Sequence, residues 1–181
     1  MLYNTYARLY TAPFYVFIII SIMIIIVWTC LSLLPINRRI WKYINLFLFV
    51  VYFGCVLYMT LFSRSYEKRE LSLIPFSVFT LAQTYPDVYN QIAMNVLMFV
   101  PFGILLPYVL NHRIKYKIAV TIALGLLISL LIEVSQYFFM RGLAETDDLI
   151  FNTLGVCIGT LSYLLYSLLL RRHVRIKKTR Y

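Results

Sequence analysis

The sequence is poor in charge, and this already excludes most protein classes. Only 13% of its 181 residues are Asp, Glu, Lys or Arg, and just 7 of them are acidic, whereas 62% of the chain is hydrophobic. A soluble domain cannot cover its surface with so few charges, so the composition indicates an integral membrane protein. No stretch outside the hydrophobic segments is long enough to bury a separate core, which predicts a single membrane domain over residues 1–181.

Cysteine and histidine are scarce as well, with 3 and 2 copies. Cys30, Cys55 and Cys157 fall inside hydrophobic segments, without paired spacing and without a histidine at metal-motif distance. Neither a Ser-His-Asp set nor a phosphate-cradling loop is visible. The sequence therefore predicts no disulfide framework, no metal site and no cofactor, and it does not favour an enzyme.

Five hydrophobic stretches approach the length of about 20 residues at which a helix crosses a bilayer. They are Phe14 to Leu34, Ile44 to Phe62, Ile92 to Leu110, Ile118 to Met140 and Leu149 to Leu170. The alternating pattern of a membrane β-barrel is absent, so we predict an all-α integral membrane protein, a bundle of about five transmembrane helices. Between the second and third, the apolar stretch from Leu71 to Leu81 is too short to span and is expected to be interfacial or re-entrant. A surface-lying linker and a lid remain alternatives for it.

Positive charge is distributed unevenly between the two sides of these spans. Twelve of the 17 Lys and Arg residues lie after the first span, after the third span and in the basic tail at 171–181. Because Lys and Arg accumulate on the cytoplasmic side, we expect an N-terminus outside and a C-terminus in the cytoplasm.

The net charge of +10 does not indicate a nucleic-acid partner. Its basic residues form short clusters beside the spans and lack a groove-reading or base-stacking module. Membrane insertion and attraction to anionic lipid explain them, so membrane lipid is the expected partner.

Polar residues within the last three spans converge at one depth. Asn95, Glu133 and Asn152 all lie within roughly 5 to 11 Å of the same membrane boundary, at about 1.5 Å of rise per helical residue. Helical spacing also aligns polar or small residues on one face of each of the last two spans. These faces hold Ser129, Glu133 and Gln136 on the fourth span, and Asp148, Asn152, Gly155 and Gly159 on the fifth. Gly155 and Gly159 form a small-xxx-small pattern, which predicts close packing against the third or fourth span.

An ionised carboxylate in hydrocarbon is costly, so Glu133 is expected to be protonated, paired with a cation such as Arg141, or hydrated. A plain interhelical hydrogen bond from Glu133 to Asn152 or Asn95 is the structural alternative. Asp148 and its neighbour Asp147 lie at the start of the last span and are expected to cap it. Arg141, on the other side of the loop between the fourth and fifth spans, could clamp this loop by ion pairing or hold an anionic ligand. The sequence does not separate these roles.

These residues carry a resemblance to a known family. The segment from Asn95 to Gly103, then Glu133 and Gln136, and then Arg141, Asp148, Asn152, Gly155 and Gly159 in this order resemble the VanZ family over roughly residues 45–170. The segment Ile74-Pro75-Phe76 resembles a stretch upstream in the family. The resemblance implies a bacterial cell-envelope protein of the cytoplasmic membrane, associated with low-level resistance to teicoplanin-type glycopeptide antibiotics.

Three kinds of function stay open. The preferred one is a protein that binds a glycopeptide drug or a lipid-linked envelope precursor in an outward-facing pocket beneath residues 63–91. That pocket would be lined by Asn95, Glu133, Gln136, Arg141, Asp148 and Asn152. The alternatives are an intramembrane hydrolase or transferase that uses Glu133 as general base, and a small lipid transporter or flippase, for which an oligomer would supply the pathway.

Overall fold

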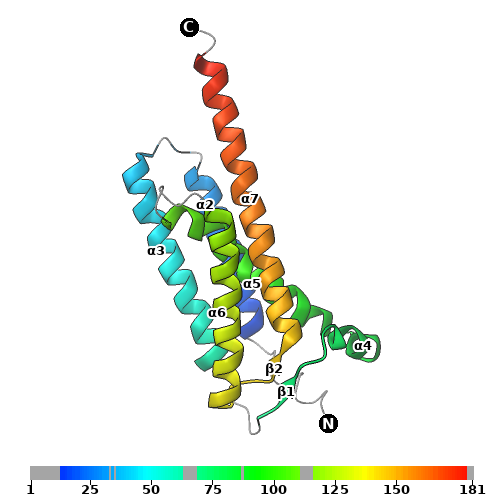
Figure 1. The fold of residues 1–181 in the computed structure, drawn as a ribbon. Helices are drawn as coiled ribbons and strands as arrows, with labels where there is room; N and C mark the ends of the chain where they lie inside the picture. The colour runs from blue at the N-terminus through cyan, green and yellow to red at the C-terminus, as the bar shows by residue number, and fades with distance from the viewer. Residues whose placement is uncertain are drawn as a thin grey trace.

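The computed structural model describes residues 13–32, 34, 36–62, 69–86, 88–110 and 116–178, with side chains described except at 13–17, 38 and 170–178. Its helices are α2 Pro13–Ser32, α3 Arg38–Leu57, the π-helix η1 Tyr58–Phe62, α4 Ser77–Thr84, α5 Val88–Val109, α6 Lys117–Phe139 and α7 Thr146–Lys178. Two short strands, β1 Leu71–Ser72 and β2 Ala144–Glu145, pair with each other. Figure 1 shows the long helices side by side, which confirms the predicted all-α bundle.

The bundle has the dimensions and the surface of a membrane protein. Four described helices are long and apolar enough to cross a bilayer, and α2 adds a shorter apolar helix over Ile18–Ser32. The four are Arg39–Phe62, Val88–Val109, Lys117–Phe139 and Thr146–Leu169. Their outer faces expose large apolar side chains such as Phe47, Leu131 and Leu165, which are 68%, 54% and 54% exposed. Such faces are stable only against lipid or another apolar surface, so the chain is a multi-pass membrane protein.

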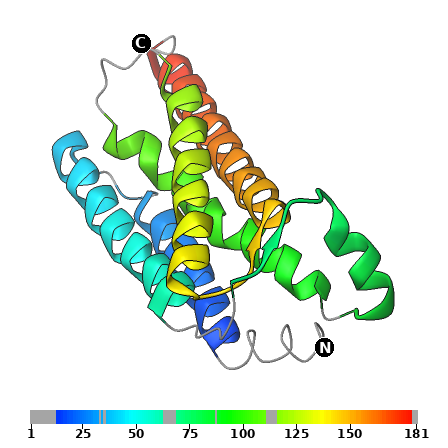
Figure 2. The ribbon, with the colours of Figure 1, turned by 60° about the horizontal axis from the view of Figure 1, so that its bottom comes forward.

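Helix α5 is the centre of the fold. It packs against α7, α3, α2 and α6, and Figure 2 shows it crossing obliquely behind α6. From Val96 onward the helix is apolar on all sides, as a helix must be when neighbours surround it. Phe99, Phe102 and Leu105 are each 1% exposed, and Tyr52 of α3 and Val156 of α7 join the same core.

Glycines set the close contact between α5 and α7. A Cβ built at Gly155 would lie 2.1 Å from the carbonyl oxygen of Val96, and one at Gly159 would lie 2.1 Å from that of Val100. On the facing helix, a Cβ at Gly103 would lie 2.3 Å from the carbonyl oxygen of Val156. The small-xxx-small pattern thus faces α5, the third predicted span, and it lets the two backbones touch.

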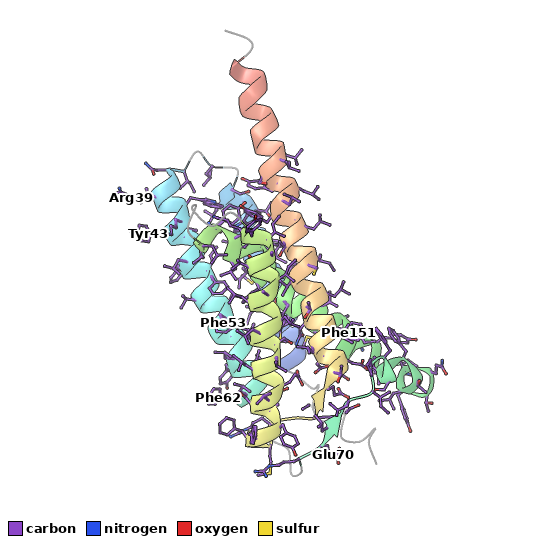
Figure 3. The ribbon with its side chains drawn as sticks, viewed as in Figure 1. Arg39, Tyr43, Phe53, Phe62, Glu70 and Phe151 are labelled. Atoms are coloured by element: carbon purple, nitrogen blue, oxygen red, sulfur yellow. The ribbon has the colours of Figure 1, made fainter. Side chains whose placement is uncertain are left out.

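Aromatic rings join α2 to the rest of the bundle at the end where α3 begins. Trp28 packs its ring 5.7 Å from that of Tyr108 and 5.3 Å from that of Tyr166, centroid to centroid. Its indole Nε1 donates a hydrogen bond of 2.9 Å to Asn45 Oδ1. Figure 3 places the labelled Arg39 at this end and Glu70 at the opposite end. The rings contact one another, so they serve to dock the helices.

Helix α7 runs past the expected end of the last span. It continues to Lys178, so much of the basic tail predicted at 171–181 extends the same helix, which projects beyond the bundle in Figure 1. Residues 179–181 lie outside the described part of the chain. The cytoplasmic location of this tail stays a prediction.

The segment between the second and third spans forms β1 and α4. Helix α4 projects to the side of the bundle, at the end opposite to the C-terminus (Figures 1 and 2). Val78 and Ala82 turn inward, whereas Leu73, Ile74 and Phe76 are 68%, 72% and 54% exposed. A short helix with one buried face and neighbouring exposed apolar side chains is compatible with an interfacial position, which stays a prediction.

Candidate functional site

Buried polar side chains gather at the end of the bundle that carries the two strands. We name them the polar cluster: Gln91, Asn95, Ser129, Glu133, Gln136, Glu145, Asp148 and Asn152, from α5, α6, β2 and α7. None of these residues is more than 8% exposed. Ionisable and amide groups inside a membrane bundle are costly to bury, so their gathering marks this end as the candidate functional site.

Two hydrogen bonds tie α5 to the start of α7 and the strand before it. Asn95 Nδ2 donates to Asp148 Oδ1 at 2.5 Å, and Gln91 Nε2 donates to Glu145 Oε2 at 2.9 Å. Gln91 and Asn95 are four residues apart and therefore share one face of α5. The acceptors of both bonds are carboxylates, which makes the bonds stronger than those between neutral groups.

Helix α6 contributes a second set of contacts. Asn152 Nδ2 donates to Ser129 Oγ at 2.9 Å, and the main-chain N–H of Glu145 donates to Glu133 Oε2 at 3.0 Å. The plain interhelical bond expected for Asn152 therefore goes to a serine. Glu133 instead accepts from the backbone of β2, so it orients the loop that leads into α7.

Gln136 links the cluster to the end of the second span. Its Nε2 donates to the main-chain carbonyl of Thr60 at 3.2 Å. Thr60 lies in η1, the wider π-helical turn that ends α3. Short π-helical turns are frequent at functional sites, and here the turn presents a carbonyl to a neighbouring helix.

The strands fix the interfacial segment on top of this end. β1 and β2 are parallel, with Leu71 opposite Ala144 and Ser72 opposite Glu145. Thr146 Oγ1 also donates to the carbonyl of Ser72 at 3.3 Å. Glu145 belongs both to this strand pair and to the polar cluster. It therefore connects the segment that contains β1 to the cluster.

Asp147 caps a helix other than its own. Its carboxylate accepts hydrogen bonds from the main-chain N–H groups of Phe76 and Val78, the latter at 2.9 Å, and from Ser77 Oγ at 3.3 Å. These groups form the N-terminus of α4, where a carboxylate is favourable. Phe76 itself has the left-handed conformation, with φ 62°, which such contacts help to maintain.

Arg141 lies at the rim of the cluster. It follows Met140, whose φ of 53° ends α6, and its main-chain N–H donates to the carbonyl of Gln136 at 2.9 Å. This is the usual geometry of a left-handed helix end. The side chain is half-buried.

The structure brings together most of the residues that the sequence predicted. Asn95, Glu133, Gln136, Asp148 and Asn152 all belong to the polar cluster, and Arg141 lies beside it. The predicted pocket lining lacked three members of the cluster, of which Ser129 was already placed on the polar face of the fourth span. Gln91 carries a signal, because it lies four residues before Asn95 on the same helical face. Glu145 carries no such signal, because the pairing of β2 with β1 and the bond from Gln91 place it in the cluster.

The cluster is suited to hydrogen bonding with a ligand. The amide oxygens of Gln91, Gln136 and Asn152 accept no hydrogen bond among the described residues. In the same part of the chain, no group of three or more His, Cys, Asp or Glu side chains is arranged to hold a metal ion. Buried amide oxygens of this kind can accept hydrogen bonds from water or from a ligand.

The cap on α4 gives a first prediction. Replacing Asp147 by alanine should lower the free energy of unfolding by about 1–3 kcal/mol, because the part-buried N–H of Phe76 and the buried N–H of Val78 lose a carboxylate acceptor. Hydrogen exchange of the purified protein in detergent should be faster across 69–84. Ser77→Ala is the matched control, since it removes only the 3.3 Å contact and should change exchange little. Equal exchange in the two variants would contradict this role.

Comparisons with known proteins agree on one family. A model of the VanZ/LLP1 family matches residues 49–170. Protein VanZ from Enterococcus faecium is 30% identical over 117 residues, which cover 63% of this chain and 62% of that protein. The chain thus spans less than two thirds of that relative's length, and no solved structure matches it. Because the family match covers more than half of the sequence and includes the whole polar cluster, the chain belongs to the VanZ/LLP1 family.

Proposed function

We propose that this protein acts in the bacterial cell envelope by binding the polar part of a membrane-associated ligand in the polar cluster. The ligand would be a lipid-linked envelope component or a teicoplanin-type glycopeptide, and binding would contribute to tolerance of such drugs. The proposal combines the family membership of the chain with the buried polar side chains of the polar cluster.

One observation carries the proposal. Gln91, Gln136 and Asn152 are 4%, 2% and 1% exposed, yet each leaves an amide oxygen without a donor among the described residues. A buried polar atom without a partner costs about 1–3 kcal/mol. Ser21 Oγ and Tyr108 Oη are two further such atoms elsewhere in the described bundle, but the three amide oxygens gather in the polar cluster, where a ligand's donors would gain affinity from them.

The side of the membrane that the site faces is inferred from the distribution of Lys and Arg. With 12 of the 17 basic residues assigned to the cytoplasmic side, the cluster would face outward, toward envelope precursors and drugs. The segment that carries β1 and α4 would then cover it from outside. We expect a ligand to enter by displacing this segment, which Asp147 and the strand pair hold in place.

The test is the teicoplanin inhibitory concentration of a susceptible Gram-positive host. It would express the wild type, Glu133→Gln or an empty vector, with membrane abundance matched by immunoblot. We expect the wild type to raise tolerance at least about twofold and Glu133→Gln to lose most of that gain, because an amide supplies neither the charge nor the second acceptor oxygen of a carboxylate.

Ser135→Ala is the matched control. Ser135 lies on the same helix, two residues from Glu133, and its hydroxyl donates to the carbonyl of Leu131 on an exposed face. Its tolerance should equal that of the wild type. If Glu133→Gln lost abundance and tolerance in equal measure, Glu133 would be a packing residue and the proposal would fail for it.

A further inference from the structure

Residues 144–148 connect β2 to the start of α7, and we name them the junction. Three of them hold the β1–α4 segment, which comprises residues 69–84. The main-chain N–H of Ala144 and the hydroxyl of Thr146 both donate to carbonyls in or beside β1, at 3.2 and 3.3 Å. The Asp147 carboxylate accepts from main-chain N–H groups at the start of α4. The junction therefore holds the β1–α4 segment at both its strand and its helix.

The other two residues of the junction contact the polar cluster. Glu145 accepts a hydrogen bond of 2.9 Å from Gln91 through its side chain, and its main-chain N–H donates to Glu133 at 3.0 Å. Asp148 accepts from Asn95 at 2.5 Å. Figure 1 shows the junction where the chain passes from α6 into α7, with β1 beside β2. Contacts to the segment and contacts to the cluster thus alternate along a few residues of one backbone.

The junction is short and largely buried. Its residues other than Thr146 are only 3% to 8% exposed, so water does not readily replace a lost contact there. Because neighbouring residues share a planar peptide unit, a shift of one residue displaces the next, whose contact lies on the other side. Contacts on the two sides are therefore expected to depend on each other rather than to add independently.

We propose that the junction couples the β1–α4 segment to the polar cluster, so that the two are ordered together and loosened together. A ligand that changes how the cluster holds Glu145 and Asp148 would then change how firmly the segment is held, and the reverse follows by linkage. This last step rests on the proposed function. The coupling itself is a property of the fold, so it is measurable without a ligand.

Independent anchoring of the segment is the alternative. Val78 and Ala82 of α4 share a hydrophobic cluster with Val88 of α5 and Phe151 of α7. If this packing alone ordered the segment, a change in the polar cluster would not reach it. The test therefore alters Glu133, because it lies on α6 and bonds to the main chain of the junction.

Hydrogen exchange of the purified full-length chain in dodecyl maltoside measures the coupling, with Glu133→Leu as the test variant. Leucine cannot accept a hydrogen bond from the N–H of Glu145. We expect exchange across 69–84 to become about threefold to tenfold faster, the range for loss of one buried hydrogen bond. Exchange in the core of α5, at 98–106, should stay within about twofold of the wild type, because the loosening is local.

Two variants of α6 separate this effect from general damage to the cluster. Glu133→Gln should restore most of the protection, because its amide oxygen can accept the same bond. Ser129→Ala is the matched control. Ser129 lies four residues before Glu133 and accepts from Asn152 rather than from the junction, so exchange across 69–84 should remain near the wild-type rate.

A second route to the junction covers the case in which Glu133→Leu does not fold. Gln91→Leu removes the bond to the side chain of Glu145 and should also speed exchange across 69–84. In an Asp147→Ala background the segment is already loosened. Either leucine variant should then add less to the exchange rate than it does alone.

Several results would overturn the coupling. Unchanged exchange across 69–84 in both leucine variants, or fully additive effects with Asp147→Ala, would show independent anchors. Equal acceleration in α5 and in the segment would indicate a global loss of stability, and an equal effect of Ser129→Ala would indicate packing. Coupling without drug tolerance from the wild type would reject the proposed function alone, whereas tolerance without coupling would reject the junction alone.

Discussion

Replacing Gly159 by alanine should lower the free energy of unfolding by about 3 kcal/mol, although it adds only one methyl group. The new Cβ would lie 2.1 Å from the carbonyl oxygen of Val100 and 2.9 Å from the Cα of Gly103. Both are backbone atoms of α5, which cannot rotate away as a side chain can. Overpacking costs typically about 1–3 kcal/mol, and a clash between two backbones belongs at the upper end.

Gly54→Ala is the matched control for this prediction. Gly54 also lies within a predicted span, in α3, and nothing lies within 4 Å of a Cβ built there. Alanine favours a helix over glycine by up to about 1 kcal/mol, so this variant should be neutral or more stable. Thermal unfolding in detergent should therefore move in opposite directions for the two variants. Equal changes would show that α5 and α7 are not in backbone contact.

The bond between Asn95 and Asp148 should be the strongest single polar contact between α5 and α7. A double-mutant cycle of Asn95→Leu and Asp148→Leu should give a coupling energy of about 1–2 kcal/mol. Interhelical hydrogen bonds in membranes average about 0.6 kcal/mol and reach about 1.7. This one lies at the upper end because it is 2.5 Å long, its acceptor is a carboxylate and both residues are no more than 6% exposed.

Denaturation of the two single variants and the double variant in mixed micelles would measure this coupling. Each single variant should lose more stability than half of the double variant's loss, because it leaves one partner buried without the other. Asn95→Leu combined with Ser162→Ala is the control pair, since the Ser162 hydroxyl donates to the carbonyl of Ile158 in its own helix. Additive losses in the Asn95 and Asp148 cycle would contradict a direct bond.

Much of the fold was predictable because the bilayer constrains it. Backbone groups in lipid must bond within their own helix, so each apolar stretch of sufficient length specifies one helix and approximate ends. The same argument placed Asn95, Glu133 and Asn152 at one depth, because depth depends only on rise per residue and on which ends are joined. Packing between Gly155, Gly159 and a neighbour followed from their spacing.

The partners of these residues were not predictable. Sequence spacing shows which side chains share a helical face but not how far each helix is rotated or which helix it meets. The bond of Asn152 to Ser129, and of Gln136 to a main-chain carbonyl in η1, depends on those rotations. The capping of α4 by Asp147 joins residues about 70 positions apart, and no local rule anticipates it.

The sequence by itself determined the class of this protein, the approximate limits of the last four predicted spans, and which polar residues lie within them, because these follow from hydrophobicity and helical rise. Only the tertiary structure decided that Glu145 and Gln91 join the site, that Asp147 holds the start of α4, and that three amide oxygens of the site face no donor among the described residues. Those features depend on side chains from distant segments meeting at defined distances, and hydrogen bonds form only within such distances.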